Sequence, residues 1–440
     1  MIYLAINFNP IYWNTACLIV NSGAADEDNA GSTDYGKIAK AIGDIMSAGI
    51  KISIVDINKS DFGFAPDIDN NQILFGLKGM LNVGDDLVVS IIENRPYTSP
   101  RDFLNRVKPN KQAMISLIKG GAFDKLMDRK TCMAWYIWNT CDKKSRLTLQ
   151  NMASLIKYDL LPKDKQEYIT AKRFYEFNRY LKSICKHSTV EYKLDDRAVN
   201  FMIEMDLDYL LTGIKGDWFL NVKQWDKNVY QVQMDVFRKW ITDNKDSILV
   251  DLNTKIFKED WDKYAKGNLS SWEMEVLCFY YHEHELKNVN KYKYGLSDFD
   301  KIPSEPVVEK TFMSRGQEVK MFKLYKICGT CIAKNKTRGT VTLLTTSGVV
   351  DVKFRKEYFS LFDKQISEKG ADGVKHVKEK SWFNRGNMIL VQGIRSGDEF
   401  LPKKYASSAG HQLYKITAID NKSGEILLTD QRYQGEMEDE

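Results

Sequence analysis

Residues 77–92 read LKGMLNVGDDLVVSII, and this stretch predicts two short amphipathic helices joined by a tight turn. Apolar side chains recur at helical spacing on both sides of Asn82-Val83-Gly84. A glycine with an asparagine beside it suits a turn in which the backbone takes a positive φ. Asp85 and Asp86 then begin the second helix, where acidic side chains are favoured. A helix-hairpin-helix of this kind presents backbone N–H groups that can hold a phosphate without reading a base, although an ordinary helical hairpin is the alternative.

A second helical stretch follows at Pro109–Asp124, with the sequence PNKQAMISLIKGGAFD. If the two stretches bind DNA, we expect the contacts to come from the turn and from nearby lysines, because cations neutralise the phosphate backbone. The candidate DNA-binding residues of this region are Lys78, Asn82, Val83, Gly84, Lys111 and Lys119.

The composition is that of a folded protein with several domains. The chain has 440 residues, of which 43% are hydrophobic and 12% aromatic, and its net charge is only +5. A nucleic-acid surface therefore has to come from local clustering of charge. Seven cysteines without framework spacing suit a reducing cytosol. No apolar run approaches the roughly 20 residues of a membrane span, and the N-terminus is no convincing signal peptide. We therefore expect a cytoplasmic protein that does not bind a membrane.

The periodicity of the sequence changes along the chain. Asp34–Ala48 has the apolar spacing of a helix, and residues 127–286 are largely helical in pattern. Residues 287–320 show no periodicity, which favours a linker. After Phe322 the pattern becomes that of strands, with runs at Val341–Thr345 and Gly348–Phe354 joined by a Thr-Ser-Gly turn. Five or so strands within about a hundred residues suit a small Greek-key barrel.

The barrel region carries the local charge that the whole chain lacks. Between Phe322 and Lys403 there are 16 Lys and Arg residues against eight Asp and Glu. Cationic loops and interleaved aromatic rings are typical of surfaces that bind single-stranded nucleic acid, because cations contact the phosphates and rings stack on the bases. Alternatively, the lysines form a solvated face, and Trp382 and Phe383 fill the barrel core. The candidate nucleic-acid-binding residues are Lys334, Lys336, Arg338, Lys353, Arg355, Trp382 and Arg385.

Two further motifs have alternative interpretations. The segment from Gln233 to Phe237 is similar to a short peptide that docks on a sliding clamp, but the surrounding spacing also fits an amphipathic helix that buries Phe237. Cys278, His282 and His284 are of metal-ligand type, and Cys278 and His282 could share a helix face. However, a fourth ligand is missing, so an ordinary helix end is the better interpretation. We assign no catalytic residue, no metal ligand and no cofactor to this chain.

Taken in order, several segments resemble the C-terminal half of the bacterial DNA polymerase III alpha subunit, the C family of DNA polymerases. Asn110–Asp124 matches the family's long N-K…G-A-F-D signature, and Gly76–Arg95 matches its hairpin, with Asn82 at the first glycine position. Because asparagine tolerates a left-handed backbone, the turn should survive this change. The other matching segments are Tyr3–Ala5 with Asn9–Trp13 (end of the fingers), Val55–Ser60 (P-D-I-N-x-S) and Glu273–Leu286 (the helix that ends in H-P-L).

The resemblance implies a multidomain α+β fold: a mostly helical N-terminal two-thirds with the helix-hairpin-helix, then a C-terminal OB-like barrel. The expected parts are an end of the fingers (1–25), a helix-hairpin-helix region (26–126), a helical connecting domain (127–286), a linker (287–320), an OB-like barrel (321–435) and an acidic tail (436–440).

The same resemblance implies a role in DNA replication. The family's palm, whose aspartates hold Mg²⁺, has no counterpart in these residues, so the chain would not be active as a nucleotidyltransferase alone. It would bind duplex DNA through the hairpin and single-stranded template through the barrel, in the cytoplasm of a bacterial host. Its partner would be a palm-bearing polypeptide, with a sliding clamp as a further candidate. A stand-alone nucleic-acid-binding accessory protein and a remnant without a partner remain as alternatives. The sequence style indicates a phage source.

Overall fold

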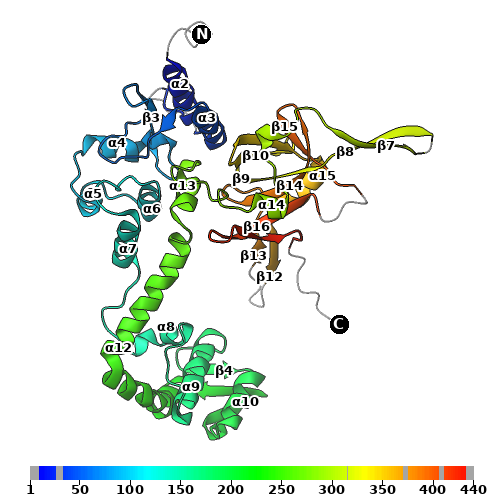
Figure 1. Ribbon diagram of the computed structural model, residues 1–440. Helices are drawn as coiled ribbons and strands as arrows, with labels where there is room; N and C mark the ends of the chain where they lie inside the picture. The colour runs from blue at the N-terminus through cyan, green and yellow to red at the C-terminus, as the bar shows by residue number, and fades with distance from the viewer. Residues whose placement is uncertain (1–8, 26–32, 315, 370–374, 406–410, 433–440) are drawn as a thin grey trace. The chain divides into compact units, whose positions relative to one another are not determined.

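The structure is a computed structural model, and it describes residues 9–25, 33–314, 316–369, 375–405 and 411–432 (Figure 1). The chain divides into two compact units, one formed by Met1–Trp135 with Ala265–Glu440 and the other by Tyr136–Tyr264. The first unit is therefore discontinuous in sequence, and residues 265–286 fold with it rather than with a connecting domain. The expected motif at Tyr3–Ala5 and the acidic tail at 436–440 lie outside the described residues.

The N-terminal part of the first unit consists of short helices and a small sheet (Figure 1). Side chains at the helix starts explain where the helices begin. Asp34 accepts a bond from the Lys37 backbone N–H at 3.1 Å, and Asn110 accepts one from the Ala113 N–H at 2.8 Å. The elements are α2 (Pro10–Ser22), α3 (Tyr35–Ser47), β1 (Lys51–Ile52), β2 (Ala65–Asp67), β3 (Gln72–Leu74), η1 (Leu77–Gly79), α4 (Asp85–Glu93), α5 (Pro100–Val107), α6 (Lys111–Lys119) and α7 (Arg129–Thr140), with sheet order β1-β3-β2.

A buried network of charges holds the GAFD signature against α13 (Leu269–Leu277). The Arg129 guanidinium donates two bonds to the Asp124 carboxylate, at 3.1 and 2.5 Å, and one to Glu273 at 2.8 Å. Glu273 is fully buried, and it also accepts the backbone N–H groups of Tyr281 and His282 at 3.0 and 2.9 Å. Each buried charge is therefore paired and hydrogen-bonded, as burial requires.

The C-terminal part of the first unit is a closed barrel of five strands. The strands close in the order β9-β10-β11-β15-β14 and back to β9, and helix α15 lies in the chain between the third strand and β14. This topology is consistent with the expected OB-like fold. The elements are β9 (Tyr325–Asn335), β10 (Thr340–Thr345), β11 (Gly348–Lys353), α15 (Lys356–Asp363), β12 (Ile366–Lys369), β13 (Lys375–Glu379), β14 (Met388–Ser396) and β15 (Glu399–Pro402), with β16 (Leu413–Asp420) and β17 (Glu425–Thr429) continuing the sheet beyond β14.

The segment expected to be a linker, residues 287–320, contains regular structure. It holds α14 (Lys291–Tyr294), η5 (Phe299–Lys301), β7 (Val308–Ser314) and the start of β8 (Gln317–Phe322). β7 and β8 pair with each other as an antiparallel hairpin, which extends away from the barrel in Figure 1. The lack of periodicity in the sequence reflects the exposure of both faces of this hairpin, because every described residue of β7 is exposed.

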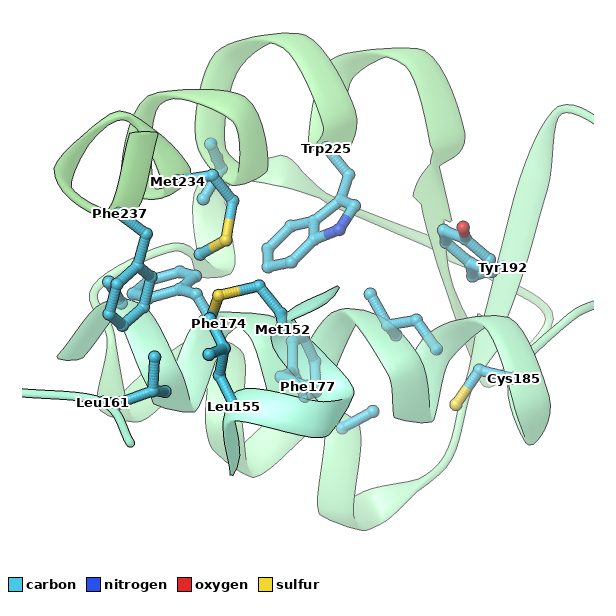
Figure 2. Packing of buried hydrophobic residues seen from close by; sticks show 14 of the residues in the cluster. Met152, Leu155, Leu161, Phe174, Phe177, Cys185, Tyr192, Trp225, Met234 and Phe237 are labelled. Carbon is cyan, nitrogen blue, oxygen red and sulfur yellow. The ribbon is translucent and has the colours of Figure 1, made fainter. Parts of the chain in front are cut away.

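The second unit has its own core and its own three-stranded sheet, ordered β4-β6-β5. Figure 2 shows Phe174 and Phe177 facing Trp225, Met234 and Phe237 across this core. The indole N–H of Trp225 donates to Asn178 at 3.0 Å, which satisfies its one polar group. The elements are η2 (Leu149–Asn151), α8 (Met152–Lys157), α9 (Gln166–Ser183), β4 (Glu191–Leu194), α10 (Asp196–Glu204), η3 (Asp208–Leu210), β5 (Leu211–Ile214), β6 (Asp217–Asn221), α11 (Val222–Gln224), the π-helical η4 (Trp225–Tyr230) and α12 (Gln231–Tyr264).

None of the helices in the described ranges is long and apolar enough to cross a membrane.

Candidate nucleic-acid interface

The hairpin at residues 77–92 forms, but its two halves differ. The second half is the expected helix α4, whereas the first half is the single 3₁₀ turn η1. The chain does not continue as an α-helix after η1 because the backbone N–H of Leu81 donates instead to the Val276 carbonyl in α13, at 3.0 Å. The prediction of two α-helices is therefore wrong for the first of them.

Asn82 takes the left-handed conformation of the turn, with a φ of 64°, whereas Gly84 has a φ of −81°. Of the glycine and the asparagine that the sequence offered for the positive φ, the asparagine takes it, as its tolerance of a left-handed backbone allows. The Asn82 side chain donates from Nδ2 to the Ser116 hydroxyl of α6 at 3.0 Å, which ties the turn to the signature helix. Val83 is buried beneath the turn. Two residues of the turn are therefore anchored: Asn82 by its bond to Ser116 and Val83 by burial.

The N-terminus of α4 is open. Its N-cap residue is Gly84, which has no side chain to accept the first backbone N–H groups. A Cβ atom built on Gly84 meets no other atom within 4 Å, so this corner of the hairpin borders open space. The uncapped N–H groups are therefore accessible to an anion such as a phosphate.

The two lysines nearest the hairpin are engaged within the protein. Lys78 is buried and forms an ion pair with Asp85, and Lys119 is buried and forms an ion pair with Glu275 at 2.6 Å. Lys111 is the first residue of α6 and is partly exposed. Of the six predicted hairpin residues, Asn82 and Gly84 therefore lie at the accessible surface of the turn, while Lys78 is paired within the hairpin and Lys119 links α6 to α13.

The barrel gathers three of its predicted cations at one end. The β9–β10 turn lies beside the end of β11 because the Phe354 backbone N–H donates to the Gly339 carbonyl at 2.9 Å. Lys336 and Arg338 on this turn are exposed, and so is Arg355 at the start of α15. Lys336 lies 3.5 Å from Asp363 but is still 74% exposed, so most of its charge reaches solvent. We call Lys336, Arg338 and Arg355 the basic end of the barrel.

The other predicted barrel residues are paired with neighbouring side chains or buried. The ammonium of Lys334 is partly buried against Asp363 at 2.5 Å, and Lys353 lies 3.4 Å from Glu399. Arg385 contacts the Tyr35 ring, with 5.2 Å between the guanidinium carbon and the ring centroid. Trp382 is completely buried in the barrel core, which agrees with the alternative that this ring fills the core. Trp382 is therefore removed from the candidate interface.

The segment that resembles a clamp-binding peptide is helical. Gln233 and Phe237 both lie in α12, and Phe237 is completely buried. Its ring stacks on Tyr168 with 6.0 Å between the centroids. The helical alternative describes this segment, and Phe237 offers no free surface to a partner in this conformation.

The candidate metal ligands do not share a helix face. Helix α13 ends at Leu277, and Cys278 follows in a left-handed conformation, so the expectation of one helix through His282 is wrong. His282 Nδ1 lies 2.6 Å from Glu273, whereas His284 Nε2 lies 3.0 Å from the Leu344 carbonyl of β10. Within the ranges that the structure describes, no group of three or more His, Cys, Asp or Glu side chains is arranged to hold a metal ion.

His284 gives the first unit a predicted dependence on pH. Burial lowers the pKa of His284 to about 4, and its neutral ring bonds the Leu344 carbonyl. In the unfolded chain the pKa is about 6.5, so the unfolded state takes up a proton first as the pH falls. The free energy of unfolding should therefore decrease between about pH 6.5 and pH 4, by roughly 2–3 kcal/mol.

Unfolding by urea as a function of pH should show this decrease in the wild type and a smaller one in His284→Gln. His187→Gln, on an exposed histidine, should behave as the wild type.

Some residues that shape the interface carried no signal in the sequence. Arg129 and Ser116 were not candidates. However, Arg129 pairs with the Asp124 carboxylate of the signature, and Ser116 accepts the bond that holds Asn82 in the hairpin turn. The asparagine at position 82 was the available clue for the turn, because asparagine is the residue other than glycine that most readily takes a left-handed backbone.

Comparisons with known proteins agree with the hairpin geometry. A family model described as a helix-hairpin-helix motif matches residues 49–132. The probable DNA polymerase YorL of Bacillus subtilis and the DNA-directed DNA polymerase of Bacillus phage SPbeta are each 39% identical to this chain, over 98% of the chain and 34% of the relative. The DNA polymerase III subunit alpha of Thermus aquaticus is 38% identical over 23% of the chain and 9% of that protein.

The chain thus spans about a third of the length of the relatives that match it from end to end. The matches to DNA polymerase III alpha subunits cover shorter segments. The resemblance drawn from the hairpin and the GAFD signature is confirmed. The chain is a homologue of C-family DNA polymerases, and it fits a C-terminal portion of a protein of the DNA polymerase III alpha type.

Proposed function

We propose that this chain is the DNA-holding portion of a replicative DNA polymerase, binding duplex DNA through the hairpin and single-stranded template through the barrel. The observation that carries the proposal is the fixed, uncapped N-terminus of α4 at the Asn82-Val83-Gly84 turn, inside the region that matches the helix-hairpin-helix motif. Phosphate contacts of this kind position DNA without specifying its sequence. The exposed basic end of the barrel supplies cations for the unpaired strand.

The hairpin part of the proposal is tested at Asn82. A β-branched residue at a φ of 64° is strained by about 1–2 kcal/mol, so Asn82→Val should distort the turn and weaken duplex binding about tenfold or more. Asn82→Gly loses the same side-chain bond to Ser116 but keeps the turn, since glycine adopts this conformation freely, so it should retain more duplex affinity than Asn82→Val. Fluorescence anisotropy with a labelled duplex measures both affinities.

Gly84→Val, two residues away, is a second probe of the same corner. Gly84 has an extended backbone and open space around its Cβ position, so valine should leave the fold of the turn intact but fill the space beside the N-terminus of α4, and duplex binding should weaken. Binding of a single-stranded oligonucleotide should be unchanged in Asn82→Val, because the barrel is untouched. Equal duplex affinity in wild type and Asn82→Val would refute the role of the hairpin.

We further propose that a polypeptide bearing the palm, with its Mg²⁺-binding aspartates, completes the active site. The relatives that match along the whole chain are DNA polymerases about three times its length, which supports this view. Mixing this chain with a separately purified palm-bearing partner should stimulate primer extension. If this chain binds DNA but no such partner responds to it, the chain acts as a stand-alone DNA-binding protein instead.

A further inference from the structure

Helix α3 covers the sheet face of the barrel. Ala39 in α3 packs in one apolar cluster with Ile332, and Leu344 and Val349 of the second and third barrel strands lie against the same cluster. Lys40 forms an ion pair with Asp351 of β11 at 2.9 Å. OB folds bind oligonucleotides on the face formed by their second and third strands. In this chain the equivalent face, β10 and β11, is therefore occupied by the protein itself.

The fit between α3 and the barrel is close. A Cβ atom built on Gly43 would lie 2.2 Å from Val349 Cγ2, and one built on Gly36 would lie 2.9 Å from the Ala333 Cβ. Only glycine permits such an approach of helix to sheet at these two positions. The contact surfaces are also apolar, whereas a face that binds nucleic acid needs exposed rings and cations. The contact is therefore close and largely apolar.

A second surface of the barrel has the exposed apolar side chains and cations that the covered face lacks. A cleft of about 890 Å³ lies beside α15, and it shares no lining residue with β10 or β11. Its apolar wall comes from Tyr358, Leu361, Phe362 and Ile366, and Leu361 is 56% exposed. The volume is within the range of pockets that hold small ligands. We call this hollow the α15 cleft.

The charges around the α15 cleft favour an anionic ligand. Lys364 and Lys375 line it and are exposed, and neither ammonium has an ion-pair partner among the described residues. Asp430 also lines the cleft, but its carboxylate lies 3.0 Å from the His411 ring. Arg432 is held by Glu379 at 3.3 Å. Two free cations at the rim of an apolar hollow suit a ligand with one flat apolar part and phosphate groups.

We propose that the α15 cleft holds a nucleobase and the adjoining phosphates of single-stranded nucleic acid, in place of the covered sheet face. This inference rests on the proposed single-strand role of the barrel and assigns that role a location. The strand enters at the basic end, where Arg355 precedes α15, and reaches Lys364 just beyond the C-terminus of the same helix. An eight-residue helix is about 12 Å long, a distance that a short run of extended strand spans.

The test is the affinity of the full chain for a fluorescein-labelled oligothymidylate over a range of salt concentrations. The double variant Lys364→Gln/Lys375→Gln should bind at least tenfold more weakly, and its slope of log affinity against log salt should fall by about 1.4, or about 0.7 for each lost phosphate contact. Tyr358→Leu should weaken binding about fivefold or more through the lost ring while leaving the salt slope unchanged. The matched control, Lys320→Gln/Lys422→Gln, removes two exposed lysines elsewhere and should bind as the wild type does.

A variant of α3 separates this proposal from binding on the covered face. In Gly43→Val the added side chain would clash with Val349, because a Cβ atom at position 43 already lies 2.2 Å from Val349 Cγ2, and α3 should loosen from the barrel. This variant should bind the oligonucleotide as tightly as the wild type, because no residue of α3 lines the α15 cleft. Tighter binding by Gly43→Val would show that the strand uses the face beneath α3, and it would overturn the proposal. So would equal affinities of the Lys364→Gln/Lys375→Gln variant and its control. Absence of single-strand binding by the wild type would instead refute the barrel role on which the cleft depends.

Discussion

Replacing Arg129 by alanine should lower the free energy of unfolding of the first unit by about 3–5 kcal/mol, because it leaves a buried carboxylate without its cation. Arg129 is 3% exposed and Glu273 is fully buried, so the Glu273 carboxylate is left in a poorly solvated site. The guanidinium also donates to the Asp124 carboxylate of the signature and, at 3.1 Å, to the Lys119 carbonyl. The loss of Arg129 should therefore destabilise both α6 and α13.

Hydrogen exchange measured by mass spectrometry can localise this effect. Peptides from α6 and α13 should lose protection in Arg129→Ala, while peptides from α9 in the second unit should not change. Lys287→Ala is the control, because its ion pair with Glu283 lies on the surface and should contribute less than about 1 kcal/mol. Unchanged protection of α6 and α13 in Arg129→Ala would show that the network does not stabilise the signature.

Replacing Phe237 by alanine should destabilise the second unit by about 3–5 kcal/mol, as expected for removing a fully buried aromatic ring. The ring packs against Tyr168 and Trp240, with centroid distances of 6.0 and 6.4 Å. The cavity left behind lies in the core shown in Figure 2, next to Met234. Urea unfolding followed by hydrogen exchange in α9 and α12 should report the loss.

The companion variant Gln233→Ala distinguishes the two interpretations of this segment. Gln233 is only partly buried in α12, so its replacement should change stability by less than about 0.5 kcal/mol. A clamp-binding peptide would need both side chains for binding and neither for folding. Phe237→Ala with unchanged stability, and loss of clamp binding in both variants, would therefore restore the peptide interpretation.

Local structure could be predicted where neighbouring residues decide it. The helix expected at Asp34–Ala48 is α3, with Asp34 as its N-cap. The strands expected at Val341–Thr345 and Gly348–Phe354 are β10 and β11, and they pair across the predicted turn. Apolar spacing, capping side chains and turn residues act within a few positions of one another, so a single sequence displays them directly.

Contacts between distant residues could not be predicted in the same way. Arg129 and Glu273 are 144 positions apart, and no spacing rule connects them. Asn82, the left-handed residue of the hairpin, is held by Ser116, which lies 34 positions away. The sheet of the second unit is a similar case, because β6 pairs with β4 and β5 inside a region whose pattern is largely helical.

The sequence by itself therefore determined the hairpin, the signature helix, the barrel strands and the resemblance to a polymerase. Only the tertiary structure decided which candidate side chains remain available for DNA. Lys78, Lys119 and Trp382 are buried, whereas Lys336, Arg338 and Arg355 stay exposed. The physical reason is that secondary structure depends on near neighbours, while the burial and pairing of a side chain depend on elements that pack against it from far along the chain.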